Sequence, residues 1–240
     1  MNIRNPDAAL RVDFHTHILP GMDDGAKDLS VSLRMLGALR AQRVGAVALT
    51  PHFYPHRETL SAFLERRERA WQELSAAVAG GDYPALLPGA EVYLTPGLAE
   101  MDLRALSMGE AGLLLVEMPR QAYRSWMIEE ICNLTFSLGI RPVIAHVDRY
   151  LPWYSREDYE GLFSFGECLY QFNAEGLEDK KAVRLLRRLA EEGRPLLIGS
   201  DAHNLTDRPP DFTRARQLLQ KKPLLAVAGA VVDTLHALEL

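Results

Sequence analysis

Short apolar runs alternate with longer segments of helical periodicity along the chain. The runs that predict buried strands cover residues 12–14, 45–50, 86–94, 112–117, 141–147, 168–173 and 195–200. The segments that predict helices cover residues 28–43, 58–79, 123–138, 156–165, 178–192, 211–220 and 224–238, whereas residues 94–107 fit neither pattern. Because strands and helices alternate, the pattern favours an α/β fold whose parallel strands are joined by helical crossovers.

The length of 240 residues suits one large α/β barrel or two small domains. No internal repeat, low-complexity tract or linker-like stretch interrupts the chain. We therefore expect a single domain over residues 1–240, in which residues 1–11 form an N-terminal extension before the first strand. Seven strands are compatible with an open doubly wound sheet or with a barrel, and the polar residues help to decide between them.

Charge, cysteine content and hydropathy exclude several classes of protein. The net charge of −5 gives no basic footprint for non-specific nucleic-acid binding. Cys132 and Cys168 form neither a disulfide framework nor a Cys-x-x-Cys site, which favours buried thiols in a reducing compartment. The N-terminus has no apolar signal-peptide core, and no run approaches the ~20 apolar residues of a membrane span. We expect a soluble cytoplasmic protein without membrane insertion.

Metal-capable side chains accompany six of the seven predicted strands, and the remaining strand ends in Asn173. These candidate ligands are His15, His17, Asp24, His52, Glu91, Glu117, His146, Asp201 and His203. Residues two apart in a strand point to the same face, so the His-x-His pair at residues 15 and 17 can hold one ion. A closed barrel brings the carboxyl ends of its strands together. The positions therefore favour a barrel with a metal centre at one end.

The types of candidate ligand indicate the metals and the charge of the site. Without a cysteine, imidazole and carboxylate ligands suit manganese, iron, cobalt or zinc. Three divalent ions would carry more positive charge than the four candidate carboxylates can neutralise, so the pocket should attract an anion such as phosphate. Close metal ions lower the pKa of a shared water towards ~7, and the resulting hydroxide could attack a phosphate ester.

Two arginines are candidate clamps for the phosphate group. Arg149 lies three residues after His146, and Arg208 lies five residues after His203. A guanidinium group matches phosphate oxygens with two parallel hydrogen bonds. Spacing alone is equally compatible with two arginines that face solvent at the rim.

The competing chemistry of cysteine-dependent phosphatases does not fit the chain. That mechanism needs an arginine six residues after the catalytic cysteine. Leu138 and Ala174 stand at that distance from the two cysteines. A Walker-type glycine-lysine loop is also absent from the sequence.

The motifs resemble those of the PHP (polymerase and histidinol phosphatase) superfamily, and more closely those of bacterial PHP-type protein-tyrosine phosphatases encoded in capsule and exopolysaccharide loci. The matching motifs lie at residues 13–17, 23–25, 50–52, 89–91, 116–119, 144–150 and 199–203. With Arg208 they cover nearly the whole chain. The Asp-Asp-Gly at residues 23–25 and the His-x-x-Arg-Tyr at residues 146–150 are the more specific marks.

This resemblance implies a distorted (β/α)7 barrel with two or three divalent metal ions, most often manganese. The implied ligands are His15, His17, Glu91 and Asp201 for the first ion, Glu91, Glu117 and His146 for the second, and Asp24, His52 and His203 for the third. Arg149 and Arg208 would grip the phosphate. The implied substrate is the phosphotyrosine-rich tail of a polysaccharide-export tyrosine kinase.

The chain departs from the family pattern at a few positions. Asp148 stands where glutamate is expected, and the loop at residues 53–56 has no match. His56 in that loop either lines the pocket mouth or is simply exposed. Tyr54, Tyr150 and Trp153 are candidates to stack on an aromatic leaving group, although an ordinary surface or core role is the simpler interpretation of each.

Three other functions compete with tyrosine dephosphorylation. The same scaffold could hydrolyse a small molecule such as histidinol phosphate or a sugar phosphate. A non-catalytic metal-binding or regulatory protein is a more remote alternative, because the candidate ligand set is complete. The acidic balance argues against a 3′-exonuclease.

Overall fold

The computed structural model describes residues 7–240, and its nine strands pair in parallel within two sheets. The smaller sheet has the order β1-β2-β4, with β1 Val12–Thr16, β2 Ala46–Leu49 and β4 Ala85–Pro88. The larger sheet contains, in spatial order, β3 His52–Phe53, β5 Glu91–Tyr93, β6 Leu113–Glu117, β7 Arg141–Ile144, β8 Leu169–Asn173 and β9 Leu196–Gly199. The predicted parallel α/β architecture is therefore confirmed.

Two short links in the chain join a strand of the smaller sheet to a strand of the larger one. Strand β2 leads into β3 within three residues, and β4 leads into β5 across Gly89 and Ala90. The predicted strand at residues 86–94 is thus two short strands that belong to different sheets. Seven strand positions remain, as predicted, but they are divided between two sheets and do not form one continuous barrel sheet.

Strand β1 lies beside the chain that leaves β9. The Asp201 amide donates to the His15 carbonyl at 2.7 Å, and the His17 amide donates to the Ala202 carbonyl at 2.9 Å. A single parallel bridge joins Thr16 to Ala202. These bonds bring the first and last strands together, so residues from both ends of the chain share one site.

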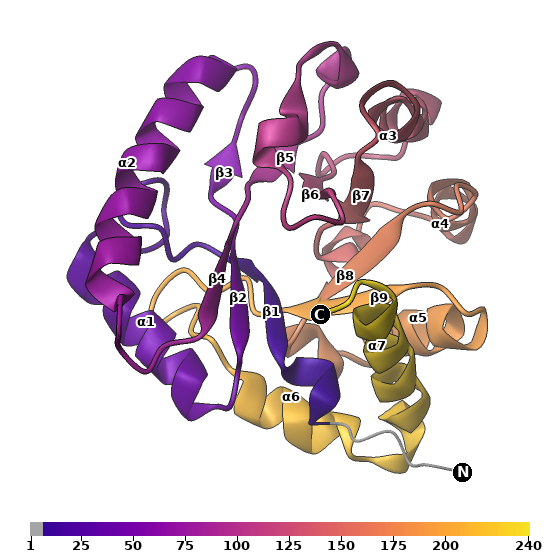
Figure 1. The fold of residues 1–240 in the computed structure, drawn as a ribbon. Coiled ribbons are helices and arrows are strands. Elements are labelled where there is room, and N and C mark those ends of the chain that lie inside the picture. The colour runs from indigo at the N-terminus through magenta and orange to yellow at the C-terminus, as the bar shows by residue number, and fades with distance from the viewer. Residues whose placement is uncertain (1–6) are drawn as a thin grey trace.

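Seven helices match the predicted helical segments to within a few residues, except that α4 is shorter than its segment. They are α1 Leu29–Ala41, α2 Leu60–Val78, α3 Ser125–Leu138, α4 Arg156–Leu162, α5 Lys180–Glu191, α6 Phe212–Leu219 and α7 Leu225–Ala237. Figure 1 shows the strands at the centre, with α1 and α2 on one side and α5 and α7 on the other. The unassigned segment 94–107 contains two short 3-10 helices, Leu98–Glu100 and Leu103–Leu106.

Side-chain caps begin several of these helices. The Asp28 carboxylate accepts from the Val31 amide at the start of α1, and Ser155 forms a capping box with Asp158 at the start of α4. Such caps satisfy backbone donors that a helix leaves free at its N-terminus. Gly139 ends α3 with a φ of 67°, a conformation that glycine adopts without strain.

Strands β1, β6 and β8 are buried along their whole length, as expected for parallel strands covered by helices. Their apolar side chains join one contiguous hydrophobic core. Part of the predicted N-terminal extension belongs to it, because Ala9 and Leu10 are buried in the 3-10 helix Ala8–Leu10. Residues 1–6 of the extension lie outside the described residues.

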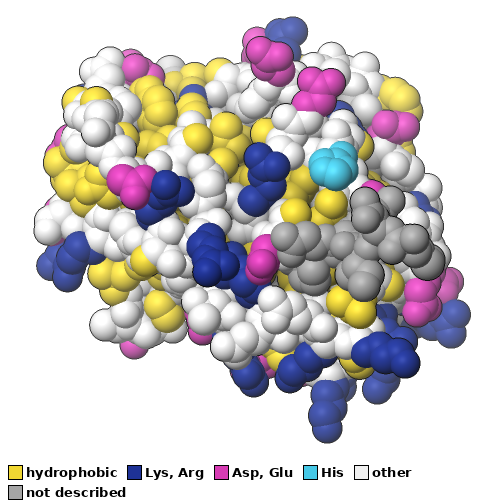
Figure 2. Space-filling model, turned by 60° about the horizontal axis from the view of Figure 1, so that its bottom comes forward, with side chains coloured by type: hydrophobic (Ala, Val, Ile, Leu, Met, Phe, Trp, Pro, Cys, Tyr) yellow, Lys and Arg dark blue, Asp and Glu magenta, His cyan; other side chains and the backbone are white. Residues whose placement is uncertain are grey.

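Charged side chains of both signs lie on the face of the molecule drawn in Figure 2. On the face drawn in Figure 2, basic and acidic side chains are scattered among apolar and uncharged ones and do not form one continuous basic stripe. Within residues 7–240, no helix is both long enough and apolar enough to cross a membrane.

Candidate metal centre

The nine predicted ligands converge at the carboxyl ends of the strands, around a cavity of about 690 Å³. Six of them line this cavity: Asp24, His52, Glu91, Glu117, His146 and Asp201. His15, His17 and His203 are buried beside them. The strand-end pattern therefore predicted which side chains the fold brings together.

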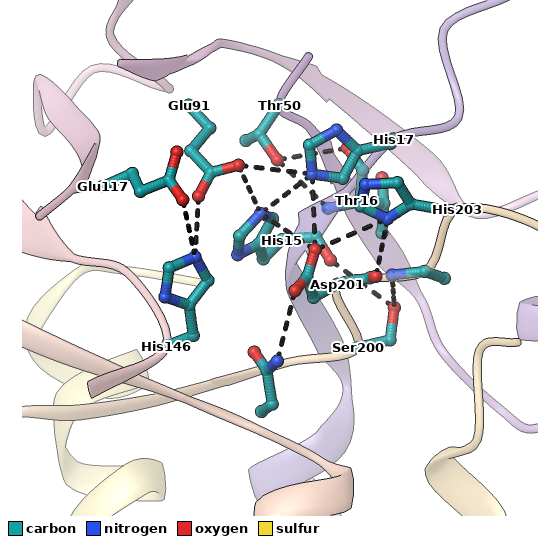
Figure 3. Close-up of polar contacts among 12 residues, drawn as sticks. His15, Thr16, His17, Thr50, Glu91, Glu117, His146, Ser200, Asp201 and His203 are labelled. Atoms are coloured by element: carbon teal, nitrogen blue, oxygen red, sulfur yellow. Dashed lines mark hydrogen bonds and ion pairs between the residues drawn. The ribbon is translucent and has the colours of Figure 1, made fainter. Parts of the chain in front are cut away.

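Glu91 on β5 contacts several histidine rings of the cluster, and Figure 3 draws its contacts with His15, His17 and His146. Its Oε2 lies 3.1 Å from His15 Nε2, 3.3 Å from His17 Nε2 and 3.0 Å from His52 Nδ1. Its Oε1 lies 2.9 Å from His146 Nε2. Because the two oxygens face different histidines, one carboxylate could bridge two ions.

Asp201 extends the cluster on the other side of the two N-terminal histidines (Figure 3). Its Oδ1 lies 3.4 Å from both His15 Nε2 and His17 Nε2, and 3.5 Å from His203 Nδ1. Asp24 stands at the rim, where its side chain is 68% exposed and its Oδ1 lies 3.5 Å from His203 Nε2. The cluster therefore runs from a buried floor to an open mouth.

Four overlapping groups have ligand atoms close enough to share an ion, all within 4.8 Å of one another. They are His17 with His52 and His203, His15 with Glu91 and His146, His15 with His17 and Asp201, and His52 with Glu91 and Glu117. The overlap at His15, His17, His52 and Glu91 makes the cluster continuous, as a site for several neighbouring ions requires.

Two features of the histidine rings fit a cluster of cations. His15 Nε2 and His17 Nε2 are 3.0 Å apart, close to the about 3.3 Å that separates two nitrogen ligands of one tetrahedral ion. The buried nitrogens His52 Nδ1 and His203 Nε2 lie near the carboxylates of Glu91 and Asp24, but neither makes a hydrogen bond of good geometry to a residue between 7 and 240. Buried polar atoms normally have partners, and a metal ion would satisfy both lone pairs.

Crowding of ionisable groups shifts their pKa values in opposite directions. Burial and the adjacent Glu91 carboxylate raise the pKa of Glu117 to about 7. Burial and the neighbouring His17 ring lower the pKa of His203 to about 4. Both shifts favour the neutral form of the group, and a divalent cation would favour the ligating carboxylate form of Glu117.

The backbone is strained at two of the predicted ligands. His146 has a φ of 30° and Asp201 a φ of 53°, in the left-handed region that L-residues usually avoid. Such conformations cost about 1–3 kcal/mol each and concentrate at functional sites. The strain places the two side chains inward from the ends of β7 and β9.

Two residues that orient the histidines were not predicted. Asp23 Oδ2 lies 2.7 Å from His17 Nδ1 and also accepts from the His52 amide at 2.9 Å. Gln171 Oε1 lies 3.2 Å from His15 Nδ1 and accepts from the His146 amide at 2.7 Å. Partners of this kind fix the ring orientation of metal-binding histidines. A glutamine inside the apolar run of β8 was the available signal for the second.

Glycine is required where the Asp-Asp-Gly turn passes the floor of the site. A Cβ atom at Gly25 would lie 2.2 Å from the His17 carbonyl oxygen and 2.4 Å from the His17 Cβ atom. Only a residue without a side chain lets the turn approach this closely. The close approach of the turn places the Asp23 carboxylate beside His17 Nδ1.

Both predicted arginine clamps line the cavity wall. Arg149 Nη1 lies 2.5 Å and Arg208 Nη2 lies 2.8 Å from Asp201 Oδ2. Their side chains are 24% and 34% exposed, so neither guanidinium group stands free in solvent. The two cations therefore flank the same edge of the ligand cluster.

The candidates for aromatic stacking take different positions. Tyr54 and His56 line the cavity. Tyr150 is in the core, where its hydroxyl accepts from the Met118 amide at 2.8 Å, and the 41% exposed Trp153 is not among the residues that line the cavity. Asp148 is half-buried and accepts from the Asn173 amide at 3.0 Å, so it supports the end of β8.

Comparison with known proteins places the chain in a family. A family model described as capsular polysaccharide synthesis, CpsB/CapC, matches residues 11–231. The chain belongs to the CpsB/CapC family. This membership confirms the resemblance to capsule-locus PHP-type phosphatases that the motifs suggested.

Relatives in the CpsB/CapC family carry the names of tyrosine phosphatases. The chain is 29% identical over 222 residues to tyrosine-protein phosphatase YwqE of Bacillus subtilis, covering 88% of this chain and 84% of the relative. It is 27% identical over 228 residues to tyrosine-protein phosphatase CpsB of Streptococcus pneumoniae, covering 88% and 90%.

Solved structures agree with this placement. A chain from the crystal structures of YwqE and CpsB, described as unique metal-dependent tyrosine phosphatases, superposes with a TM-score of 0.70 at 26% identity and covers 93% and 94% of the two chains. Histidinol phosphate phosphatase of Lactococcus lactis, bound to zinc, L-histidinol and phosphate, gives a TM-score of 0.59 at 14% identity, covering 92% and 94%. The second likeness shows a shared fold.

Proposed function

We propose that this protein is a metal-dependent tyrosine-protein phosphatase, a phosphoric monoester hydrolase. The observation that carries the proposal is the convergence of nine candidate ligands and two arginines on one cavity, in a chain of the CpsB/CapC family. The names of YwqE and CpsB support phosphotyrosine as the substrate.

The proposed cofactor is a set of two or three divalent ions, with manganese as the first choice. The donor set supports this choice, because imidazole and carboxylate groups suit manganese, iron, cobalt or zinc. The proposed ligands are His15, His17, Asp24, His52, Glu91, Glu117, His146, Asp201 and His203. Bound divalent ions supply Lewis acidity and lower the pKa of water, which generates a nucleophile at neutral pH.

Arg149 and Arg208 are the proposed phosphate-binding residues. Each guanidinium group has five N–H donors, and Asp201 uses only part of them. The remaining donors are available to the oxygens of a phosphate ester in the cavity. This pairing would orient the ester and stabilise negative charge on the transferring group.

The proposed partner is a phosphotyrosine-bearing bacterial tyrosine kinase of polysaccharide export, encountered in the cytoplasm. The family description, capsular polysaccharide synthesis, supports this kind of partner. The open mouth of the cavity supports a protein substrate, since Asp24 and His56 at the rim are both exposed.

Hydrolysis of histidinol phosphate is the second candidate function. It is favoured by the shared fold with the Lactococcus lactis enzyme, whereas the relatives at higher identity are named tyrosine-protein phosphatases. Both functions would use the same cluster and the same arginines, so substrate preference distinguishes them.

A parallel assay tests the proposed function. Protein stripped with a chelator and then supplied with manganese is expected to release phosphate from a phosphotyrosine peptide at least about tenfold faster than from histidinol phosphate. The chelated protein without added metal serves as the control. A preference for histidinol phosphate would overturn the proposed substrate but not the site, and the absence of release from either ester would overturn both.

A further inference from the structure

One wall of the cavity consists of three aromatic side chains, Tyr54, His56 and Tyr93. The ring centroids are 5.7 Å apart for Tyr54 and Tyr93, 5.7 Å for His56 and Tyr93, and 5.8 Å for Tyr54 and His56. These separations lie in the range at which aromatic rings attract one another. The three rings form one contiguous patch, here called the aromatic wall.

The strand register places the aromatic wall next to the candidate ligands. Strands β3 and β5 pair in parallel, with His52 opposite Glu91. Residues two apart along a strand face the same side, so Tyr93 follows Glu91 towards the cavity and Tyr54 follows His52. The Tyr54 ring stacks on the His52 ring at 5.1 Å with an interplanar angle of 29°. The wall thus rises from the metal-capable floor towards the mouth.

The aromatic wall retains exposed ring surface. Tyr54 and Tyr93 are only half-buried and His56 is exposed. Arg57 supports the wall from one side, since its guanidinium carbon lies 4.3 Å from the centre of the Tyr54 ring. Half-buried rings in a cavity leave apolar area that a bound ring could cover.

We infer that the aromatic wall is the subsite for the ring of an aryl phosphate, and this inference rests on the proposed function. Arg149 and Arg208 flank Asp201, whereas the wall adjoins His52 and Glu91. An ester whose phosphate lies on the floor must extend its substituent towards the mouth, past the wall. A phenyl ring directly attached to the ester oxygen stacks there, and a short alkyl substituent has no ring to stack.

Binding of two phosphate-like probes to the metal-loaded protein tests the subsite. The Tyr93→Ala variant is expected to bind phenylphosphonate about three- to tenfold more weakly, as the loss of one aromatic pair implies. Its affinity for inorganic phosphate should stay unchanged, because phosphate does not reach the wall. Isothermal titration calorimetry measures both affinities.

Two further variants separate stacking from folding. Tyr93→Phe keeps the ring and is expected to bind phenylphosphonate like the wild type. Tyr83→Ala is the matched control, because Tyr83 is a partly buried tyrosine that packs against the core and does not line the cavity. The kcat/KM for a phosphotyrosine peptide should fall in Tyr93→Ala by the same three- to tenfold, through a higher KM.

The outcomes distinguish this inference from the proposed function. Unchanged phenylphosphonate affinity in Tyr93→Ala, with active wild-type protein, would overturn the aromatic subsite and leave the phosphatase function standing. An equal loss of phenylphosphonate and phosphate affinity would also overturn it, since the residue would then act on the phosphate site. A wild-type protein that binds neither probe and hydrolyses no phosphate ester would overturn the proposed function itself.

Discussion

Replacement of Glu91 by glutamine is expected to remove at least one metal ion per chain and to lower phosphotyrosine hydrolysis by more than about 100-fold. The Glu91 carboxylate lies within 3.3 Å of four histidine rings, those of His15, His17, His52 and His146. The loss of a residue that only supports a metal ligand already costs 10–100-fold in metal affinity or activity, and Glu91 is itself a proposed ligand.

Glutamine keeps the size of the side chain but removes the negative charge that several cations would share. Metal content by mass spectrometry and kcat/KM for a phosphotyrosine peptide measure the two effects. Glu160→Gln is the matched control, because Glu160 is an exposed carboxylate that pairs with Arg156 at 3.0 Å on the surface. Full metal content and full activity in Glu91→Gln would remove Glu91 from the centre.

The Arg149→Ala variant is expected to lose about 100- to 1,000-fold in kcat for the phosphotyrosine peptide while it keeps its metal ions. The Arg149 guanidinium group lines the cavity beside Asp201 and has donors to spare for a phosphate group. Removal of one group that stabilises developing charge costs this much in other hydrolases. A truncated arginine leaves every proposed metal ligand in place, so metal content and activity should separate.

Arg156→Ala provides the control for Arg149→Ala, because Arg156 is an exposed arginine that does not line the cavity of the proposed site. Arg149→Lys should recover only part of the activity, since an ammonium group cannot form the paired hydrogen bonds of a guanidinium group. Wild-type turnover in Arg149→Ala would show that Arg149 does not bind the phosphate. A parallel loss of metal would assign it to the support of Asp201.

The site was easier to predict from the sequence than the exact division of the sheets. His15, His17 and Asp201 each stand at the end of an apolar run, and parallel strands place such ends together whatever the details of the sheet. The break between β4 and β5 was missed although Pro88 and Gly89 mark it, because the residues on both sides are mostly apolar and predict one run. Hydrophobic patterning does not separate the two short strands, although β4 is partly exposed and β5 is mostly buried.

Residues that act through contacts distant in sequence could not be read from local patterns. Gln171 lies 156 residues from His15, and only the packing of β8 beside the cluster brings their side chains together. Tyr93 was hidden for a similar reason, since its contact with Tyr54 depends on the register between β3 and β5. By contrast, Asp23 lies within the Asp-Asp-Gly motif that the sequence showed, and only its contact with His17 was not predicted.

The metal content of the purified protein tests the central claim most directly. After incubation with manganese and removal of the unbound ions, inductively coupled plasma mass spectrometry measures the ratio of metal to chain. The account predicts two or three ions per chain in the wild type and fewer in Glu91→Gln. Wild-type protein without bound divalent metal, folded and incubated in the same way, would contradict the assignment of this cluster as a metal centre.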